Sequence, residues 1–479
     1  MVFSSIEFLI FFAIVFVTLL IADSKIISEK FAESTVRRLK HIFLLVVSYV
    51  FYGWWDWRFC FLMLSLTFIA YISAKKISEE KNTKFFKFLG VAFPLVILGF
   101  FKYFNFFLES FSLVFGIENM GTLNIILPVG ISFYTFQSMS YTIDVIRKDI
   151  KSENFLKVAL YVAFFPQLVA GPVVKASEFI PQLDEDRRIT KENVIKGIQI
   201  FIFGLFKKVV FADHLSVFVD DVFSKPEVFH SFSVILAVIS YSIQIYFDFS
   251  GYSDMAVGCA KCLGYDFSRN FNMPYISKNP SEFWKRWHIS LSSWLQQYLY
   301  ISLGGNRKGT ARTYINLLVT MVLGGLWHGA SWNFVLWGTL HGLLLCIHKI
   351  FKKIRKGKTG NVFSNALSVI GTYMMVCLGW IFFRADNFTT AFSVFKQVFA
   401  WNDGILQIYT WSVASIIVVI AATLTAVISA KKKNEKVVNG FYPILNPEKM
   451  SHQIIFITAV GLLIVFAYTG SNPFIYFQF

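Results

Sequence analysis

The stretch Trp411–Ala430 reads WSVASIIVVIAATLTAVISA and is followed directly by Lys431, Lys432 and Lys433. It contains no charged residue. At a rise of about 1.5 Å per residue, a helix of this length spans about 30 Å, which is the thickness of the hydrocarbon core of a bilayer. Lys residues that follow an apolar helix at once mark its cytoplasmic end. The stretch therefore predicts a membrane-spanning α-helix that ends on the cytoplasmic side.

Composition extends this interpretation to the whole chain. Apolar residues make up 56% of the 479 residues and charged residues 15%, whereas a soluble chain has about a quarter charged residues. We expect an all-α, polytopic transmembrane fold with about 11–13 spans plus re-entrant or interfacial helices. The net charge of 45 − 29 = +16 comes from Lys and Arg in short loops between apolar runs. This pattern indicates membrane topology and contact with lipid headgroups, and it excludes nucleic acid as a partner.

The apolar runs also predict the topology. The first loop, Lys25–Lys40, and a later one, Lys349–Lys358, are both basic and mark the cytoplasmic side. An even number of crossings, near twelve, is expected, so that both termini are extracytoplasmic, and residues 1–479 form a single integral-membrane domain. The expected spans are Phe8–Ile21, His41–Trp55, Phe59–Ala74, Phe88–Phe104, Ile125–Ile146, Phe155–Ala170, Val194–Val219, Ser233–Cys262, Thr313–Ala330, Trp332–Ile350, Leu367–Phe383, Trp411–Ala430 and Ile454–Tyr468.

One stretch, Asp266–Arg312, is too polar and too rich in Pro, Asn and Gly for a plain span. It still contains an amphipathic run, Ser281–Tyr300. Irregular backbone at membrane depth is tolerated only where protein or a water-filled cavity surrounds it. We therefore expect a re-entrant or interfacial helix that enters the protein from the cytoplasmic face.

His328 lies in the run LGGLWHGA, about 15 residues or 22 Å beyond the start of its predicted helix at Thr313. An ionisable side chain at this depth is by default a candidate functional residue. A neutral imidazole there can act as a general base on a hydroxyl group. The alternative is a core histidine that is hydrogen-bonded to a backbone carbonyl, and the residues alone leave both interpretations open.

His288 lies in the run FWKRWHIS. Helical spacing predicts that Trp284, Trp287 and His288 share one face of the helix. Lys285 and Arg286 then project elsewhere and suit phosphate groups. The alternative is an interfacial helix with aromatic anchors and basic residues that face lipid headgroups.

Asp248 and Asp254 lie within the apolar run YFDFSGYSDM and require partners. They are either orienting partners of a catalytic imidazole or members of a structural ion pair. Cys259 and Cys262 are interpreted as packing residues, and no metal site is expected. The remaining histidines are interpreted as loop, interfacial or packing residues: His41, His214, His230, His341, His348 and His452.

Taken together, these segments resemble the membrane-bound O-acyltransferase family, and most closely its bacterial branch that O-acetylates alginate, peptidoglycan and other cell-surface polymers. The resemblance covers essentially the whole chain, with a motif-rich core at about 241–348. The matching segments are Tyr246–Asp254, Arg269–Tyr275, Glu282–Leu291, Tyr298–Arg307 and Gly325–Gly329.

The resemblance implies a central tunnel, with a cytoplasmic and an extracytoplasmic funnel that meet at the catalytic His328. His288 is the second motif position, on the inner side of the tunnel. Where the family often has an Asp before the Tyr-Leu-Tyr segment, this chain has Gln297, so no acid role is assigned there. The residues expected to line the tunnel or the donor path are Trp284, Arg286, Trp287, Trp327, Asp248, Asp254 and Asn270.

The chain ends NPFIYFQF, which resembles the aromatic terminal motif that serves as an acyl relay in surface-polymer acylation. The hydroxyl of Tyr476 is then the group that takes the acyl group and passes it to an extracytoplasmic partner of the SGNH (esterase-like) type. A phenol beside a histidine base is a feasible nucleophile. The alternative is an aromatic belt at the membrane interface.

The function expected is therefore membrane O-acyl transfer, with acetyl as the expected acyl group, in a bacterial cytoplasmic (inner) membrane. The donor is acetyl-CoA or another acyl thioester from the cytoplasm, no cofactor is bound, and a cell-surface polysaccharide is the final acceptor. Two alternatives remain: D-alanyl transfer to teichoic acid, and a transporter or flippase without acyl chemistry.

Overall fold

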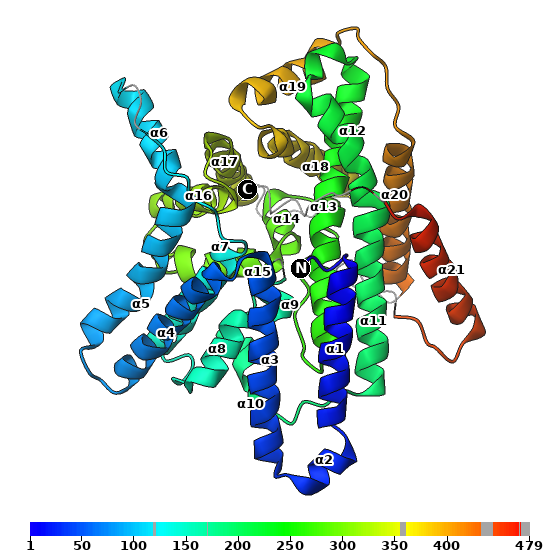
Figure 1. The fold of residues 1–479 in the computed structure, drawn as a ribbon. Helices are drawn as coiled ribbons and strands as arrows, with labels where there is room; N and C mark the ends of the chain where they lie inside the picture. The colour runs from blue at the N-terminus through cyan, green and yellow to red at the C-terminus, as the bar shows by residue number, and fades with distance from the viewer. Residues whose placement is uncertain (118–120, 170, 355–360, 433–443, 469, 471–479) are drawn as a thin grey trace. The chain divides into compact units, whose positions relative to one another are not determined.

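The structure is a computed structural model that describes residues 1–117, 121–169, 171–354, 361–432, 444–468 and 470. Within these residues the regular structure is helical, with one isolated bridge between Phe229 and Ile405 (Figure 1). Among the described residues, six helices are long and apolar enough to cross a membrane, and two shorter helices are also apolar. The predicted all-α, polytopic class is confirmed. The predicted number of spans counts shorter helices as well and stays a prediction.

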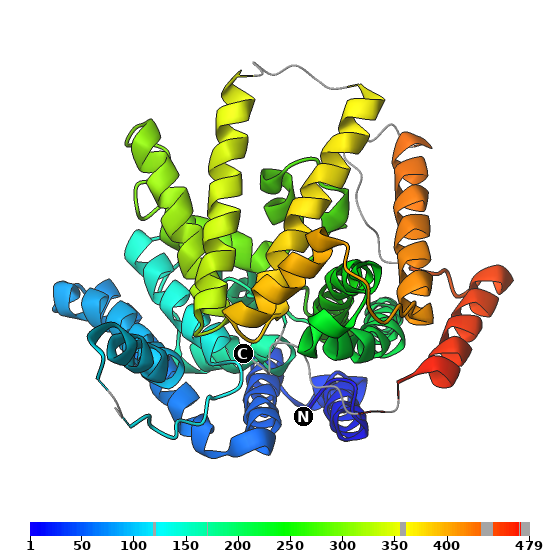
Figure 2. The same cartoon turned by 90° about the horizontal axis from the view of Figure 1, so that it is seen from above.

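The chain divides into two compact units. Unit 1 consists of residues 1–201 and 252–268, and unit 2 of residues 202–251 and 269–479. The boundary crosses two helices, α11 and α13. Figures 1 and 2 show the helices of both units from two directions.

Unit 1 contains the amino-terminal helices, one π-helical turn (η1), the start of α11 and the end of α13. Their bounds are α1 Ile6–Ala22, α2 Lys25–Lys30, α3 Glu33–Asp56, α4 Arg58–Ser78, α5 Thr83–Leu98, η1 Gly99–Tyr103, α6 Phe104–Phe115, α7 Ile131–Arg147, α8 Phe155–Ala163, α9 Phe165–Leu168, α10 Ala176–Asp184, α11 Lys191–Phe206 and α13 Ser231–Cys262.

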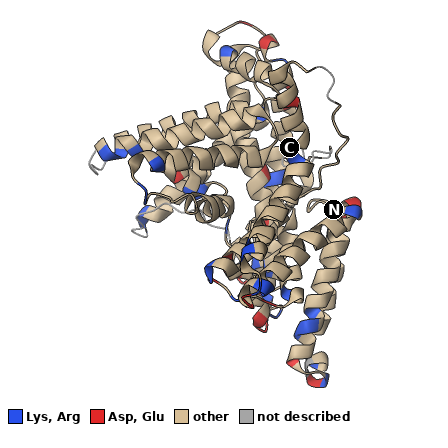
Figure 3. Ribbon diagram, turned by 90° about the vertical axis from the view of Figure 1, so that its left-hand side faces the viewer, with Lys and Arg blue, Asp and Glu red and all other residues tan. Residues whose placement is uncertain are grey.

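Unit 1 packs through small residues and phenylalanine rings. Gly90 of α5 faces α4 and α7 so closely that a Cβ atom there would lie 2.5 Å from the Thr142 side chain. The rings of Phe8, Phe51 and Phe165 contact one another in the core. Its charged residues lie mainly at helix ends and in loops (Figure 3).

Unit 2 contains the end of α11, most of α13 and the carboxyl-terminal helices. Its further elements are η2 Lys207–Ala212, α12 Asp213–Ser224, η3 Pro226–Val228, η4 Pro274–Ile276, α14 Pro280–Arg286, α15 Ile289–Trp294, η5 Leu295–Tyr300, α16 Thr310–His328, α17 Trp332–Ile354, α18 Val362–Arg384, α19 Phe388–Ala400, α20 Thr410–Lys432 and α21 Met450–Phe466.

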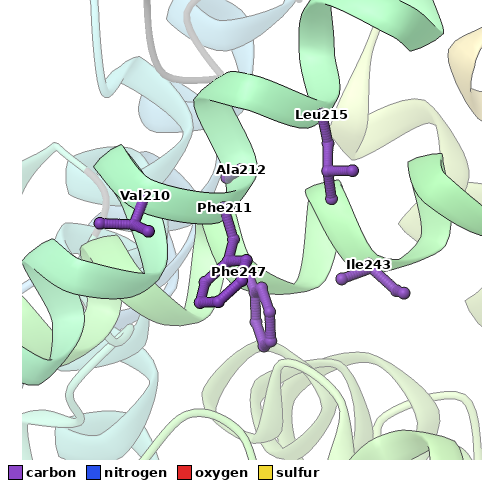
Figure 4. Close-up of a cluster of buried hydrophobic side chains, with 6 residues drawn as sticks. All are labelled: Val210, Phe211, Ala212, Leu215, Ile243 and Phe247. Carbon is purple, nitrogen blue, oxygen red and sulfur yellow. The ribbon is translucent and has the colours of Figure 1, made fainter. Parts of the chain in front are cut away.

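A buried apolar cluster holds η2 and α12 against α13 in unit 2. Phe211 contacts Phe247 with ring centroids 5.5 Å apart. Figure 4 shows the cluster, whose six members are Val210, Phe211, Ala212, Leu215, Ile243 and Phe247. Because α13 carries the first of the predicted motifs, Tyr246–Asp254, this cluster holds the part of that motif that belongs to unit 2.

Several predicted boundaries differ from the structure for local reasons. The predicted span Phe88–Phe104 continues through η1 to Phe115. The span predicted from Ile125 begins at Ile131, after Gly130, which adopts φ +72° where it passes the backbone oxygen of Leu168. The Val194–Val219 span runs from Lys191 to Ser224 through η2. Such π-helical turns leave no hydropathy signal, so the sequence could not indicate them.

Candidate active site

His288 interrupts the helix that was predicted over Ser281–Tyr300. The chain forms α14, breaks, and resumes as α15 and η5. At the break His288 has φ +42° and ψ 56°, a left-handed conformation that is rare for a residue with a Cβ atom. The prediction that Trp284, Trp287 and His288 share one helical face is therefore wrong, because His288 lies outside both helices.

Asn270 holds this break in place. Its backbone oxygen accepts a hydrogen bond from the N–H of Ile289 at 2.8 Å. Its side-chain Oδ1 accepts hydrogen bonds from the N–H and the hydroxyl of Ser290, at 3.1 and 2.9 Å, and lies 3.2 Å from Nδ1 of His288. The structure thus places Asn270 and His288, two of the predicted site residues, in direct contact.

The contact with Asn270 also determines which ring nitrogen of His288 carries the proton. An amide oxygen only accepts, so Nδ1 of His288 must carry the proton and Nε2 is left as an acceptor. His288 is fully buried, and its Nε2 has no hydrogen-bond partner among the described residues. The site therefore presents an imidazole whose Nε2 is available as a hydrogen-bond acceptor.

Arg286 braces the same break. Its guanidinium forms an ion pair with Glu282 at 2.9 Å and donates to the backbone oxygen of Asn272 at 3.1 Å. The backbone N–H of Asn272 donates in return to the oxygen of Arg286 at 2.9 Å. Arg286 is buried, which contradicts the prediction that its guanidinium projects away as a phosphate-binding group; the neighbouring Lys285 is exposed.

His328 is the last residue of α16 and is buried. The helix packs on α17 through glycines. A Cβ atom at Gly325 would lie 2.2 Å from the backbone oxygen of Phe334, and one at Gly338 would lie 2.3 Å from the backbone oxygen of Met321. The group that approaches Gly325 is the backbone of α17. This contact fixes the position of His328 along the axis of α17.

Aromatic rings connect the two histidines. The ring of Trp327 contacts His288 at a centroid distance of 5.8 Å and His328 at 4.9 Å. His328 also meets Trp337 at 5.0 Å and Phe383 at 5.1 Å, both nearly edge to face. His288 and His328 therefore both contact one indole, although forty residues separate them in the sequence.

The remaining predicted tryptophans, Trp284 and Trp287, belong to the same group of contacting rings. Trp287 is fully buried, lies parallel to Phe283 at 5.6 Å and contacts Trp380 at 4.9 Å. Trp284 is half-buried and contacts Trp337 edge to face at 5.7 Å. Four elements of unit 2, α14, α16, α17 and α18, thus contribute rings to one aromatic cluster.

Asp248 forms an ion pair with Lys208 at 2.6 Å, and Lys208 also pairs with Asp213 at 2.7 Å. All three side chains are buried. The adjacent Lys207 donates to the hydroxyl of Ser250 at 2.9 Å. Of the two interpretations for Asp248, this arrangement favours the structural ion pair, because the charged partner in the structure is a lysine.

Two predicted site residues are not among the described residues of unit 2. Asp254 is buried on α13 in unit 1, whereas the histidines belong to unit 2. Tyr476 lies outside the described residues. In the segment that precedes Tyr476 in the sequence, the backbone N–H of Tyr468 donates to the oxygen of Val209 at 2.9 Å, and Nε2 of His214 lies 3.1 Å from the oxygen of Phe466.

One residue of the cluster was not singled out from the sequence. His341 of α17 is fully buried and lies among Trp337 at 4.8 Å, Trp284 at 5.2 Å and Phe283 at 6.1 Å. Its spacing of four residues from Trp337 was the available signal, because it places both rings on one helical face. The partners on α14, however, lie far away in the sequence.

The chain is similar to known proteins over most of its length. Residues 142–388 match the model of the membrane-bound O-acyltransferase family. The chain is 37% identical to the probable alginate O-acetylase of Azotobacter vinelandii, over 92% of this chain and 95% of that protein. It is also 37% identical to the peptidoglycan O-acetyltransferase of Helicobacter pylori, over 75% and 74%. The teichoic acid D-alanyltransferase of Bacillus subtilis is 28% identical, over 55% and 70%.

The matched region contains His288, His328, the aromatic cluster around them and Asn270. The resemblance that the motifs predicted is therefore confirmed. The chain belongs to the membrane-bound O-acyltransferase family and is a multi-pass membrane enzyme of that class.

Proposed function

We propose that this protein moves an acetyl group from a cytoplasmic acyl thioester across the membrane for attachment to an extracytoplasmic polysaccharide. The observation that supports this most directly is the pair of buried imidazoles, His288 and His328, that both contact Trp327. The relatives that match over most of this chain are an alginate O-acetylase and a peptidoglycan O-acetyltransferase.

In the proposed reaction His328 is the general base. It takes the proton of the attacking hydroxyl, the oxygen attacks the thioester carbonyl, and the carbon–sulfur bond breaks. The proton passes to the thiolate, which leaves as a thiol. His288 lines the donor path, where its Nε2 accepts a hydrogen bond.

The acceptor hydroxyl in this proposal is that of Tyr476, which then hands the acyl group to an SGNH-type extracytoplasmic protein. The proposal places the enzyme in the bacterial inner membrane with both termini outside. The orientation is supported by the basic loops, which belong on the cytoplasmic side. A few residues before the terminal motif, the backbone of Tyr468 contacts η2 and that of Phe466 contacts α12.

D-Alanyl transfer is the less favoured alternative. The D-alanyltransferase of Bacillus subtilis matches only 55% of this chain at 28% identity, whereas the O-acetylating relatives match more of it at higher identity. A transporter without acyl chemistry does not fit membership of an acyltransferase family.

The test uses the purified chain in lipid vesicles with acetyl thioester, labelled in the acetyl group, on the cytoplasmic side. We expect labelled acetyl on the protein, and on polysaccharide when the partner is added. The same vesicles with labelled D-alanyl thioester should give little transfer. Transfer of D-alanyl in place of acetyl, or passage of an intact molecule without cleavage of the thioester, would overturn the proposal.

A further inference from the structure

The carboxyl-terminal helix α21 is held to unit 2 at its end. None of its 17 residues, Met450–Phe466, is buried. Beyond it, the backbone N–H of Tyr468 donates to the oxygen of Val209 in η2 at 2.9 Å. Nε2 of His214, on α12, lies 3.1 Å from the backbone oxygen of Phe466. Because α21 buries no side chain along its length, these two contacts matter greatly for its attachment.

His214 makes the contact that involves a side chain. A backbone oxygen only accepts, so Nε2 of His214 carries the proton and donates it to the oxygen of Phe466. The imidazole lies parallel to the indole of Trp411 at a centroid distance of 4.1 Å and meets the ring of Tyr468 edge to face at 5.2 Å. One side chain thus joins α12, α20 and the segment that follows α21.

The support beneath His214 is buried on both sides. Trp411 packs against the apolar cluster of η2, α12 and α13 that Figure 4 shows, and contacts Phe211 edge to face at 6.3 Å. Asp213, the residue before His214, is paired with Lys208 at 2.7 Å, and both are buried. These contacts fix the imidazole, so it can hold a segment that has little packing of its own.

The attachment lies at the end of the spans where the relay is expected. Trp411 is the second residue of α20, at the opposite end from Lys431 and Lys432, which mark the expected cytoplasmic side. Tyr476 follows Tyr468 by eight residues, a length of at most about 29 Å when fully extended. A chain held at residue 468 therefore keeps the hydroxyl of Tyr476 at a high effective concentration near this place.

We propose that His214 is a positioning residue for acyl transfer. By holding the backbone oxygen of Phe466, it keeps the terminal segment at η2 and α12, and so keeps the hydroxyl of Tyr476 within reach of the acyl group at His328. His214 acts through this segment and not on the reacting atoms. The inference rests on the proposed function, in which Tyr476 is the acceptor, and adds the residue that holds the acceptor in place.

The test uses the full-length protein in vesicles with labelled acetyl thioester, and mass spectrometry of the terminal peptide measures the rate at which Tyr476 is acetylated. His214→Phe keeps a ring against Trp411 but removes the N–H donor. We expect it to lower this rate by roughly 2- to 13-fold, as for one neutral hydrogen bond. His214→Gln, which keeps an N–H donor, should restore most of the rate.

His230→Phe is the matched control. The imidazole of His230 also contacts an indole, that of Trp401 at 6.4 Å, and its Nδ1 accepts a hydrogen bond from the N–H of Phe232 and not from the terminal segment. This variant should acetylate Tyr476 at the wild-type rate. An equal loss in His230→Phe and His214→Phe would overturn the inference, because it would show that any such ring change is harmful.

A second measurement separates positioning from general damage to the fold. The Kd of a thioether analogue of the donor, which cannot be cleaved, should be the same in His214→Phe and wild type; a weaker Kd would overturn the positioning role. Tyr468→Pro removes the other N–H of the attachment without changing α12, and it should slow acetylation of Tyr476 even if His214→Phe fails to fold.

The outcomes distinguish this inference from the proposed function. If wild type acetylates Tyr476 and both His214→Phe and Tyr468→Pro do so at the same rate, the inference is overturned and the proposed function stands. If the wild-type protein cleaves no acetyl thioester and gains no acetyl group on Tyr476, the proposed function itself is overturned.

Discussion

Nδ1 of His288 lies 3.2 Å from Oδ1 of Asn270, and that same oxygen accepts two hydrogen bonds from Ser290. One amide thus fixes both the tautomer of the imidazole and the left-handed turn from which it projects. The free Nε2 of His288 is a consequence of this contact.

Asn270→Ala removes these hydrogen bonds and should therefore reproduce the defect of His288→Ala. We expect both variants to impair transfer less than His328→Ala, or at a different step, because His288 lines the donor path in our proposal. In a double-mutant cycle, Asn270→Ala with His288→Ala should be no worse than either single change. Additive losses would show that Asn270 acts independently of His288.

His328→Ala should abolish acyl transfer while expression and membrane insertion persist. Removal of a general base costs about 10²–10⁴-fold in rate, so the residual activity should be below about one hundredth. His452→Ala, in the first turn of α21, is the control at another histidine. A His328→Ala variant that keeps more than about a tenth of the activity would contradict the base assignment.

Tyr476→Phe should remove nearly all transfer to polymer, because it deletes only the hydroxyl that receives the acyl group. Mass spectrometry of the terminal peptide from wild type incubated with donor should show an acyl mass on Tyr476. Tyr468→Phe, eight residues earlier, should transfer normally. Full polymer acylation by the Tyr476→Phe variant would rule out the relay, and a terminus accessible only from the cytoplasm would rule out the topology.

Lys208→Ala should destabilise the protein strongly, because it leaves the carboxylates of Asp213 and Asp248 without their lysine. Breaking a buried ion pair costs about 3–5 kcal/mol. The exposed pair of Lys225 and Asp221 offers the control, since Lys225→Ala should cost at most about 1 kcal/mol. Denaturation of the purified variants measures both; equal stability would show that the buried charges are not coupled.

The sequence was sufficient for the helices that depend on hydropathy alone. Apolar runs predicted α13 and α20 closely. The break at His288 could not be predicted, because FWKRWHIS contains neither Gly nor Pro and the strained turn is held by Asn270 from another segment. Strain of this kind costs roughly 1–3 kcal/mol and persists only where surrounding contacts impose it.

Partners distant in the sequence explain the other differences. Asp248 is neutralised by Lys208, forty residues earlier, and no local pattern connects them. His341 gains its surroundings from α14 and α18, so its own helix shows only the spacing to Trp337. Composition and periodicity describe each helix separately, whereas these contacts depend on which helices meet.

The glycine contacts between α16 and α17 also bear on how the enzyme moves. At Gly325 and Gly338 backbone meets backbone, without side chains whose rotamers could absorb a shift. The hairpin should therefore behave as one stiff body, with His328 carried at its tip. Any motion that admits a donor or releases a thiol must then come from the elements around the hairpin, such as the short helices on either side of His288 or α18.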